Sequence, residues 1–357
     1  MKVAILTSGG DCQGLNPTIR GVSKALYHLV PDVEIYGVRN GYLGLITDDV
    51  HCMHPSEFSN IIRLGGTILG TSRQSFKTMT NEDGSPADKV LRMIANYKKN
   101  KFDALVVLGG NGTQKTAHLL SENGVNVVFL PKTIDNDILG TDITFGFDSA
   151  VAKATDVLDS IHSTAEAHGR VLVVELMGHK VGWITLYAGI ASGVDAILIP
   201  EIPYYSERVL ELIRKRNKEG PGFTVIAISE GAMTVEESVL PREGWKNRVD
   251  KSGRRLVDFI QKKLESAGSS QEVRLVVPGY YQRGGEPTAT DRVLCSRLGV
   301  KAAELIANRQ FGYMVAEIGQ GIEAIPMADV VGQLKQVSPD SDLVRAAKSL
   351  GICFGDN

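Results

Sequence analysis

Two aspartates, Asp135 and Asp137, stand two residues apart in the segment Pro-Lys-Thr-Ile-Asp-Asn-Asp at positions 131–137. An apolar run at 125–130 comes directly before this segment and predicts a buried strand. In an extended continuation, the side chains at i and i+2 point the same way. Two carboxylates that face one small space suit phosphoryl transfer, because one can take a hydroxyl proton while the other holds a metal ion. The same residues are also typical of a solvated turn, and this segment alone favours neither interpretation.

Two glycine-rich turns each follow a predicted strand. The first covers residues 7–14 (Thr-Ser-Gly-Gly-Asp-Cys-Gln-Gly) and the second covers residues 109–113 (Gly-Gly-Asn-Gly-Thr). A strand, a tight turn and a helix start form an anion site, since backbone N–H groups and the positive helix end face the same point. Two such turns in one chain favour a polyphosphate ligand. A third turn, at 65–73, ends on Arg73, a cation that suits a transferring phosphoryl group.

Further charged and small residues follow or open other predicted strands. Arg170 and Arg274 each open a strand, and Arg283 lies in a Gln-Arg-Gly-Gly segment. Met177, Gly178 and Glu230 follow the ends of two strands. Arginine forks match phosphate oxygens, although arginines at strand ends are more often simply solvated.

Short β-branched runs alternate with longer helix-like stretches along the whole chain. The predicted strands are 3–6, 33–38, 104–108, 125–130, 171–176, 196–199, 224–228 and 274–277. The predicted helices are 19–29, 89–97, 113–120, 150–161, 209–216, 256–264 and 293–306. This alternation predicts an α/β fold with largely parallel sheets, and 357 residues exceed a comfortable single core, so two domains are expected.

The overall composition limits the classes of partner and the cellular setting that the sequence predicts. Lys and Arg total 39 against 41 Asp and Glu, which gives a net charge of −2 and argues against nucleic acid or an anionic membrane surface as partner. No apolar run approaches the roughly 18 residues of a spanning helix, and residues 1–6 lack the features of a signal peptide. The four cysteines are dispersed, which predicts a reduced, cytoplasmic protein without a zinc site or disulfides.

Taken in order, these segments resemble the 6-phosphofructokinases. The resemblance covers most of the chain, from the first glycine turn through residues 41–45, the second turn, the acidic segment at 131–137 and residues 175–178 to 282–285. It implies two Rossmann-like, three-layer α/β domains with the active site in the cleft between them. It also implies transfer of a phosphoryl group to the 1-hydroxyl of fructose 6-phosphate in glycolysis, with Mg²⁺ as cofactor. The donor in this family is either ATP or pyrophosphate.

The resemblance implies a role for each matching residue. Asp135 would be the general base on the sugar 1-hydroxyl, with Thr133 and Asp137 beside it. Asn111 and Asp137 would hold Mg²⁺, and Arg73 would stabilise the transferred charge. The donor would be held by Gly10, Arg73, Gly110, Asn111, Gly112, Thr113 and Lys132. The sugar would be contacted by Thr133, Asp135, Met177, Gly178, His179, Glu230 and Tyr280, with Arg283 on its 6-phosphate. Arg170 and Arg274 would reach the sugar from a neighbouring subunit, so a homo-oligomer, dimer or tetramer, is expected.

Positions 112 and 132 discriminate between donors in this family. Pyrophosphate users tend to carry Asp at the first and Lys at the second, whereas typical ATP users carry Gly at both; this chain has Gly112 and Lys132. A glycine leaves room for the nucleotide, so ATP is the expected donor. Pyrophosphate is the alternative, because the Lys132 ammonium suits a small polyanion.

Three residues depart from the family pattern. Asn111 stands where a metal-binding Asp is usual, His179 where an Arg is usual, and Tyr280 where a sugar-phosphate His is common. An amide oxygen is a weaker Mg²⁺ ligand than a carboxylate, so the metal would lean on Asp137, water and phosphates. Because His179 and Tyr280 differ from the usual sugar contacts, a larger sugar phosphate is an alternative substrate. Because Asn111 replaces the metal-binding Asp, a non-catalytic sensor of sugar phosphate or nucleotide is a third hypothesis.

The expected domains follow from the same resemblance. A donor-binding domain would cover residues 1–140 plus about 283–310, and a fructose 6-phosphate-binding domain would cover 141–282 plus about 311–357.

Overall fold

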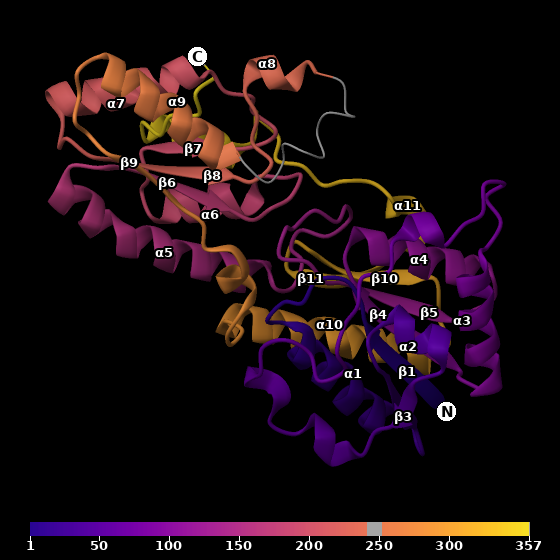
Figure 1. The fold of residues 1–357 in the computed structure, drawn as a ribbon. Coiled ribbons are helices and arrows are strands. Elements are labelled where there is room, and N and C mark those ends of the chain that lie inside the picture. The colour runs from indigo at the N-terminus through magenta and orange to yellow at the C-terminus, as the bar shows by residue number, and fades with distance from the viewer. Residues whose placement is uncertain (241–251, 357) are drawn as a thin grey trace. The chain divides into compact units, whose positions relative to one another are not determined.

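The computed structural model describes residues 1–240 and 252–356. The chain forms two compact units, each built from two separate stretches (Figure 1). Unit 1 comprises residues 1–149 and 283–335, and unit 2 comprises residues 150–282 and 336–357. The chain therefore passes from unit 1 back into unit 2 after residue 335, later than the expected position near 310. The reason is that residues 313–326 form two strands that pair with the sheet of unit 1.

Unit 1 contains one seven-stranded sheet. In spatial order its strands are β11 (Gly321–Pro326), β10 (Tyr313–Ile318), β5 (Val127–Pro131), β4 (Ala104–Gly109), β1 (Lys2–Thr7), β2 (Glu34–Val38) and β3 (Val50–Cys52). The strands from β10 to β2 pair in parallel, and β3 and β11 are antiparallel edges. The central strands are buried at every residue from Val3 to Thr7 and throughout β4 and β5, which explains their continuous apolar sequences.

Helices cover both faces of this sheet (Figure 1). The helices of unit 1 are α1 (Leu15–Leu29), α2 (Tyr42–Thr47), α3 (Asp88–Lys99), α4 (Asn111–Glu122), α10 (Ala289–Ala307) and α11 (Met327–Val330). One core joins α2, α3, α4 and α11 to alternate residues of the strands, such as Leu6 and Val107. Helices α1 and α10 pack against each other, and α10 also contacts β5 and β10. Unit 1 is thus a three-layer α/β unit.

Unit 2 repeats this plan around a smaller sheet of four parallel strands. In spatial order they are β7 (Ala196–Leu198), β8 (Thr224–Ser229), β6 (Val171–Leu176) and β9 (Val273–Val276). Its helices are α5 (Phe147–His168), α6 (Trp183–Ala191), α7 (Ser206–Glu219), α8 (Val235–Ser238), α9 (Ser252–Ser266) and α12 (Asp342–Ser349). Apolar side chains of α7 and α9 form a core with one sheet face, and Figure 1 shows α5 and α6 on the other. The predicted α/β fold with largely parallel sheets is confirmed.

Candidate active site

The first glycine turn leaves the carboxyl end of β1 and is held by two neighbouring segments. Ser8 N donates to Leu108 O of β4 (2.9 Å), and Gly9 N donates to Ser72 O (3.1 Å). Gly9 has φ +91°, a left-handed conformation that glycine adopts without strain. Because Ser72 is hydrogen-bonded to the turn, the backbone of the next residue, Arg73, also lies close to the turn. The Arg73 side chain is exposed. The structure therefore brings the first and third predicted turns together.

Gly10 lies in close contact with an arginine from a distant part of the chain. A methyl group at Gly10 would lie 1.9 Å from Nη1 of Arg283. The Arg283 Nε atom is buried and has no hydrogen-bond partner among the described residues. The absence of a side chain at Gly10 lets the guanidinium lie directly on the turn. The residue expected at the sugar 6-phosphate thus lies in unit 1, against the first glycine turn.

Lys132 reaches the same turn from the end of β5. Its ammonium donates a short hydrogen bond to the Gly10 carbonyl, and the residue is only 4% exposed. Burial lowers the pKa of the Lys132 ammonium, and the neighbouring Arg283 lowers it further, while Cys12 and Asp135 oppose the shift. Lys132 therefore holds the turn through a backbone oxygen and places positive charge beneath it.

The second glycine turn joins β4 to the start of α4. A methyl group at Gly109 would lie 2.2 Å from Cγ2 of Thr113, so a side chain is excluded there. Thr113 is buried and its hydroxyl lies 3.4 Å from Ser8 O, which ties the second turn to the first. Among the described side chains none caps the start of α4. The first N–H groups of this helix therefore face outward with the positive end of its dipole.

Gly112 differs from the other glycines of the site. It is exposed, and a methyl group added to it would meet no atom within 4 Å. The space in front of the first turn of α4 is therefore open at this position. No packing reason within the described part of unit 1 demands a glycine here, in contrast to Gly109.

The acidic segment does not continue β5 as an extended strand. Asn136 has φ +52°, so the backbone turns between Asp135 and Asp137. The prediction of an extended segment, in which both side chains point the same way, is therefore wrong. Asp135 N donates to Thr133 Oγ1 (3.0 Å), a local turn of the kind that Thr favours. The Asn111 amide donates to Asp137 Oδ2 (2.7 Å) and to its backbone oxygen (3.1 Å). A left-handed turn and a side-chain clamp from α4, rather than a strand, place the two aspartates.

Asn111 and Asp137 fit a metal ion with few protein ligands. The Oδ1 atom of Asn111 is buried and has no hydrogen-bond partner among residues 1–240 and 252–356. Its amide nitrogen is directed at Asp137, so this oxygen points away from that contact with its acceptor capacity unused. Carboxylate and amide oxygens suit Mg²⁺, which keeps several waters and is commonly bound with substrate phosphates. Within the same described residues no group of three or more His, Cys, Asp or Glu could hold a metal ion.

All these groups lie at one edge of the sheet. β1, β4 and β5 are neighbouring parallel strands, so their carboxyl ends lie side by side. Connections from β1 lead to β2 on one side and later to β4 and β5 on the other, which makes this edge a topological switch point, where open α/β sheets bind ligands. The structure brings together Gly10, Arg73, Gly110–Thr113, Lys132, Thr133, Asp135, Asp137 and Arg283 in unit 1.

In unit 2, four of the expected sugar contacts follow two adjacent strands. Met177, Gly178 and His179 follow β6, and Glu230 follows β8, which pairs with β6 up to Ser229. Glu230 N donates to Leu176 O (2.9 Å), and His179 N donates to Glu230 Oε1 (2.7 Å). Gly178 and His179 both have positive φ, +149° and +50°. The turn after β6 is thus held by Glu230, and the His179 side chain is exposed.

Arg170 and Arg274 lie at the opposite edge of the same sheet. Arg170 precedes β6, and Arg274 pairs with Leu172 near the start of β9. Glu272 bridges them, at 2.8 Å from Arg170 Nε and 3.0 Å from Arg274 Nη2. The Arg170 guanidinium, and then that of Arg274, lowers the pKa of the Glu272 carboxyl. Sequence reasoning missed Glu272, although its place two residues before Arg274, next to the strand predicted at 274–277, was a usable signal.

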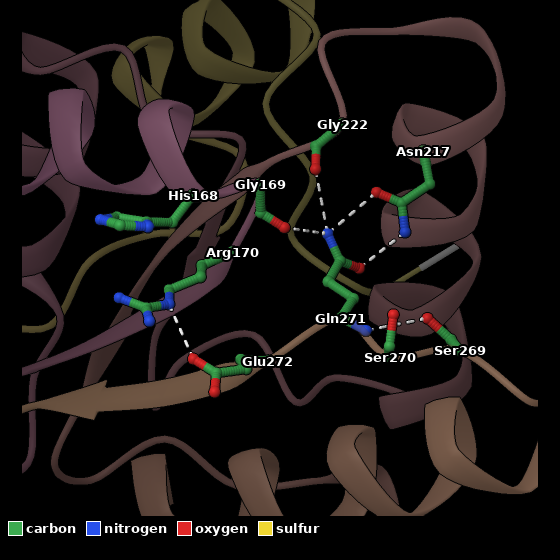
Figure 2. A pocket seen from close by; sticks show the side chains of 9 residues that line it. All are labelled: His168, Gly169, Arg170, Asn217, Gly222, Ser269, Ser270, Gln271 and Glu272. Atoms are coloured by element: carbon green, nitrogen blue, oxygen red, sulfur yellow. Dashed lines mark hydrogen bonds and ion pairs between the residues drawn. The ribbon is translucent and has the colours of Figure 1, made fainter.

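A hollow of about 450 Å³ opens beside this bridge (Figure 2). Its lining is mostly polar and includes Arg170, Asn217, Gln271 and Glu272. The Gln271 amide donates to Gly169 O (2.9 Å), Gly222 O (3.0 Å) and Asn217 Oδ1 (3.1 Å), so it ties the loops together. Figure 2 shows the Arg170 guanidinium directed away from these contacts, toward Glu272.

The two sets of expected sugar contacts in unit 2 lie at opposite edges of its sheet. Arg170 and Met177 flank the six residues of β6, so their Cα atoms are seven residues apart along the strand, or about 23 Å at ~3.3 Å per residue. That separation exceeds the span of a hexose monophosphate. Tyr280 lies beyond the end of β9, in a 3₁₀ turn (Gly279–Arg283), and is 79% exposed.

Comparison with known proteins agrees with this architecture. Residues 2–306 match the family model described as Phosphofructokinase, and the chain belongs to the phosphofructokinase family. The predicted family is confirmed. Among similar solved structures, phosphofructokinase from Saccharomyces cerevisiae has a TM-score of 0.78 at 27% identity and covers 92% of this chain and 45% of its own. A pyrophosphate-dependent phosphofructokinase from Marinobacter aquaeolei has a TM-score of 0.81 at 22% identity, covering 99% and 88%, and shares the fold.

Several relatives of known name match over nearly the full length of the chain. The "ATP-dependent 6-phosphofructokinase" of Spirochaeta thermophila is 50% identical, over 99% of this chain and 97% of its own length. The "ATP-dependent 6-phosphofructokinase 3" of Bacteroides thetaiotaomicron is 46% identical, over 99% and 100%. None of the helices in the described part of the chain is long and apolar enough to cross a membrane.

Proposed function

We propose that this chain is an ATP-dependent 6-phosphofructokinase, which transfers the γ-phosphoryl group of ATP to the 1-hydroxyl of fructose 6-phosphate in glycolysis. The observation that carries the proposal is the convergence of two glycine turns, a helix N-terminus and two aspartates at the carboxyl ends of β1, β4 and β5. Relatives with nearly full coverage carry this activity in their names. In this proposal unit 1 binds the donor and unit 2 binds the sugar.

The donor phosphates would lie against the two glycine turns. Backbone N–H groups at the start of α4 would bind phosphate oxygens, and the dipole of that helix favours their negative charge. Lys132 and Arg283 place two positive charges at Gly10, and Arg73 begins at the same turn. Fixed positive charge of this kind stabilises the charge that spreads over the transferring phosphoryl group.

Asp135 would take the proton from the sugar 1-hydroxyl as the oxygen attacks phosphorus. The phosphoryl group then passes to that oxygen, and ADP leaves with the electron pair of the broken bond. The hydrogen bond from Asp135 N to Thr133 Oγ1 fixes the local turn and therefore the direction of the carboxylate. Asn111 Oδ1 and Asp137 would hold Mg²⁺, which supplies charge neutralisation at the phosphates when bound.

Two features favour ATP over pyrophosphate. The space at Gly112 is open, which leaves room for a donor longer than pyrophosphate along the start of α4. Lys132 is buried and donates to Gly10 O, so its ammonium is committed to the protein rather than extended toward solvent. A lysine held in this way contributes background charge and does not by itself select a short polyanion.

The sugar site would be shared between copies of the chain. Met177, Gly178 and Glu230 would contact the sugar of their own chain, whereas Arg170 and Arg274, at the opposite edge of the sheet, would bind the 6-phosphate in a neighbouring subunit. Arginine forks match phosphate oxygens, and Glu272 holds both arginines in place. The proposed enzyme is accordingly a homo-oligomer, a dimer or a tetramer.

The test is formation of fructose 1,6-bisphosphate from fructose 6-phosphate, ATP and Mg²⁺, with the product identified by ³¹P NMR. We expect one ADP for each bisphosphate formed, and loss of turnover after chelation with EDTA that returns when Mg²⁺ is added back. A chain that binds both substrates but forms no product with any donor would be a sensor, and the proposal would be wrong.

A further inference from the structure

Lys335 is the last residue of unit 1 and lies against the acidic segment. Its neighbour Leu334 forms an antiparallel bridge with Ile138, and Lys335 N donates to Asp137 O (3.0 Å). Residues 334–335 therefore pair with the chain directly after the two aspartates. This pairing brings the Lys335 side chain over the turn.

The Lys335 ammonium joins several oxygens of one loop. It donates to Thr141 O (2.9 Å), to Asn136 Oδ1 (3.2 Å) and to Asp142 O. Asn136 is the left-handed residue between Asp135 and Asp137, whereas residues 141–142 lie on the return of the loop. The side chain thus clamps the turn that carries both aspartates to the segment that follows it.

Two further hydrogen bonds make this clamp part of a closed network. Thr144 N donates to Asn136 Oδ1 (3.0 Å), and Thr144 Oγ1 donates to Thr133 O (2.7 Å). Asn136 Oδ1 therefore accepts from Lys335 and Thr144 together. All these contacts lie within unit 1.

The loop at 132–146 needs such side-chain contacts because its backbone is not part of a regular β-sheet hydrogen-bond ladder. Between the end of β5 at Pro131 and the start of α5 at Phe147, the backbone forms only isolated bridges. A long irregular segment in a compact unit is usually functional and must be held by side chains. Burial lowers the pKa of Lys335 to about 8, while Asp142 and Asp137 oppose the shift. The cation is therefore held at the cost of part of its hydration, and the contacts with oxygen compensate.

We infer that Lys335 is a positioning residue for phosphoryl transfer, which acts through Asn136 and residues 141–142 to fix the directions of Asp135 and Asp137. Its ammonium donates to three oxygens of this loop. The inference rests on the proposed function for its kinetic readout, although the order of the loop can be measured without any activity.

The first variant is Lys335→Met, which keeps the length of the side chain and removes the donor. Misplacement of a reacting group by about 1 Å costs on the order of 100-fold in rate, so we expect kcat to fall about 100-fold. KM for ATP and for fructose 6-phosphate should stay within about threefold, because the backbone N–H groups at the start of α4 and the sugar contacts proposed in unit 2 lie outside this loop. Hydrogen exchange of peptides within 133–144 should speed up, while the peptides of α1, α7 and α9 keep their rates.

The second variant is Asn136→Gly, which removes the shared acceptor but keeps the left-handed backbone that glycine adopts readily. It should lower kcat in the same way, and the double variant should lose little more than the worse single variant, since both act through one contact. Asn136→Gly also carries the test alone if Lys335→Met does not fold. Lys99→Met is the control, because Lys99 forms one ion pair with Asp48 (2.6 Å) away from the loop.

A folded Lys335→Met or Asn136→Gly enzyme with unchanged kcat and unchanged exchange over 133–144 would overturn the inference. So would a rise of KM for the sugar at constant kcat, or losses that multiply in the double variant. If the unaltered chain turns over no substrate, the proposed function fails instead, and the exchange rates of 133–144 still decide whether Lys335 orders the loop.

Discussion

The expected donor site in unit 1 and the expected sugar site in unit 2 hold their polar groups in different ways. Lys132 and Thr133 in unit 1 are buried, and Asp137 is clamped by Asn111. In unit 2, Tyr280 is 79% exposed and His179 and Arg274 are also exposed. Both sites lie at the carboxyl ends of parallel strands. Unit 2 also has two expected sugar-phosphate contacts, Arg170 and Arg274, near the amino ends of its strands.

This difference indicates a division of labour. The chemistry requires atoms held to a fraction of an ångström, which a buried and cross-linked set of side chains supplies. The exposed side chains at both edges of the small sheet are suited to binding the sugar. In the proposed enzyme a sugar site is complete only when two copies of the chain assemble.

Asp135→Asn should abolish turnover most completely. General-base catalysis contributes about 10²–10⁴-fold, so we expect kcat to fall by about that factor while KM for fructose 6-phosphate changes little. Steady-state kinetics on an enzyme with an unchanged unfolding midpoint would measure this. A kcat near that of the unaltered chain would remove Asp135 from its proposed role and, with it, the catalytic half of the contrast.

Arg170→Ala should weaken sugar binding through a neighbouring subunit. A hydrogen bond to a charged group contributes about 1.5–3 kcal/mol, which predicts an increase of roughly 10- to 150-fold in KM for fructose 6-phosphate. Glu230→Ala should also impair sugar binding, from within its own chain. When the two variants are unfolded together and refolded as mixed oligomers, some sites combine an intact Arg170 with an intact Glu230, and activity should exceed that of the two separate preparations. Activity that never rises on mixing would place both residues in one chain's site.

Gly109→Ala and Gly112→Ala form a matched pair at the start of α4. The added methyl group at Gly109 would lie 2.2 Å from Thr113, whereas at Gly112 it would meet no atom within 4 Å. Overpacking costs about 1–3 kcal/mol, so Gly109→Ala should lower the free energy of unfolding by that amount, and Gly112→Ala should leave it nearly unchanged. Denaturant unfolding measures both. Equal losses would contradict the packing account of the second turn.

Gly112→Asp should shift donor preference with the smallest change in structure. The carboxylate would project into open space at the start of α4, where it would repel the α-phosphate of ATP. We expect kcat/KM for ATP to fall at least about tenfold further than that for pyrophosphate, a difference of about 1.4 kcal/mol. Equal losses with both donors would contradict the role of position 112.

The sequence predicted the central strands and the convergence of the glycine turns because both follow from local patterns. Continuous apolar runs such as 104–108 become strands buried on both faces, and turns at the ends of parallel strands must meet at one edge. The β10–β11 hairpin was missed because β11 is partly exposed and has no apolar run, and this shifted the expected boundary between units.

Details of the site that depend on distant partners could not be predicted. The left-handed turn at Asn136 is stabilised by Thr144 and Lys335, the latter 199 residues away in sequence. Arg283 lies on Gly10 across an even longer stretch of sequence, and Lys132 donates to a backbone oxygen rather than to solvent. No local pattern encodes these contacts, because tertiary packing decides them.

The most direct test of the account is a competition between donors in one reaction. The unaltered protein receives equal concentrations of ATP and pyrophosphate with fructose 6-phosphate and Mg²⁺, and the early release of ADP and of orthophosphate is measured. If the open space at Gly112 and the buried Lys132 favour the nucleotide, ADP should exceed orthophosphate at least about tenfold. An excess of orthophosphate would contradict the account and identify pyrophosphate as the donor that this site selects.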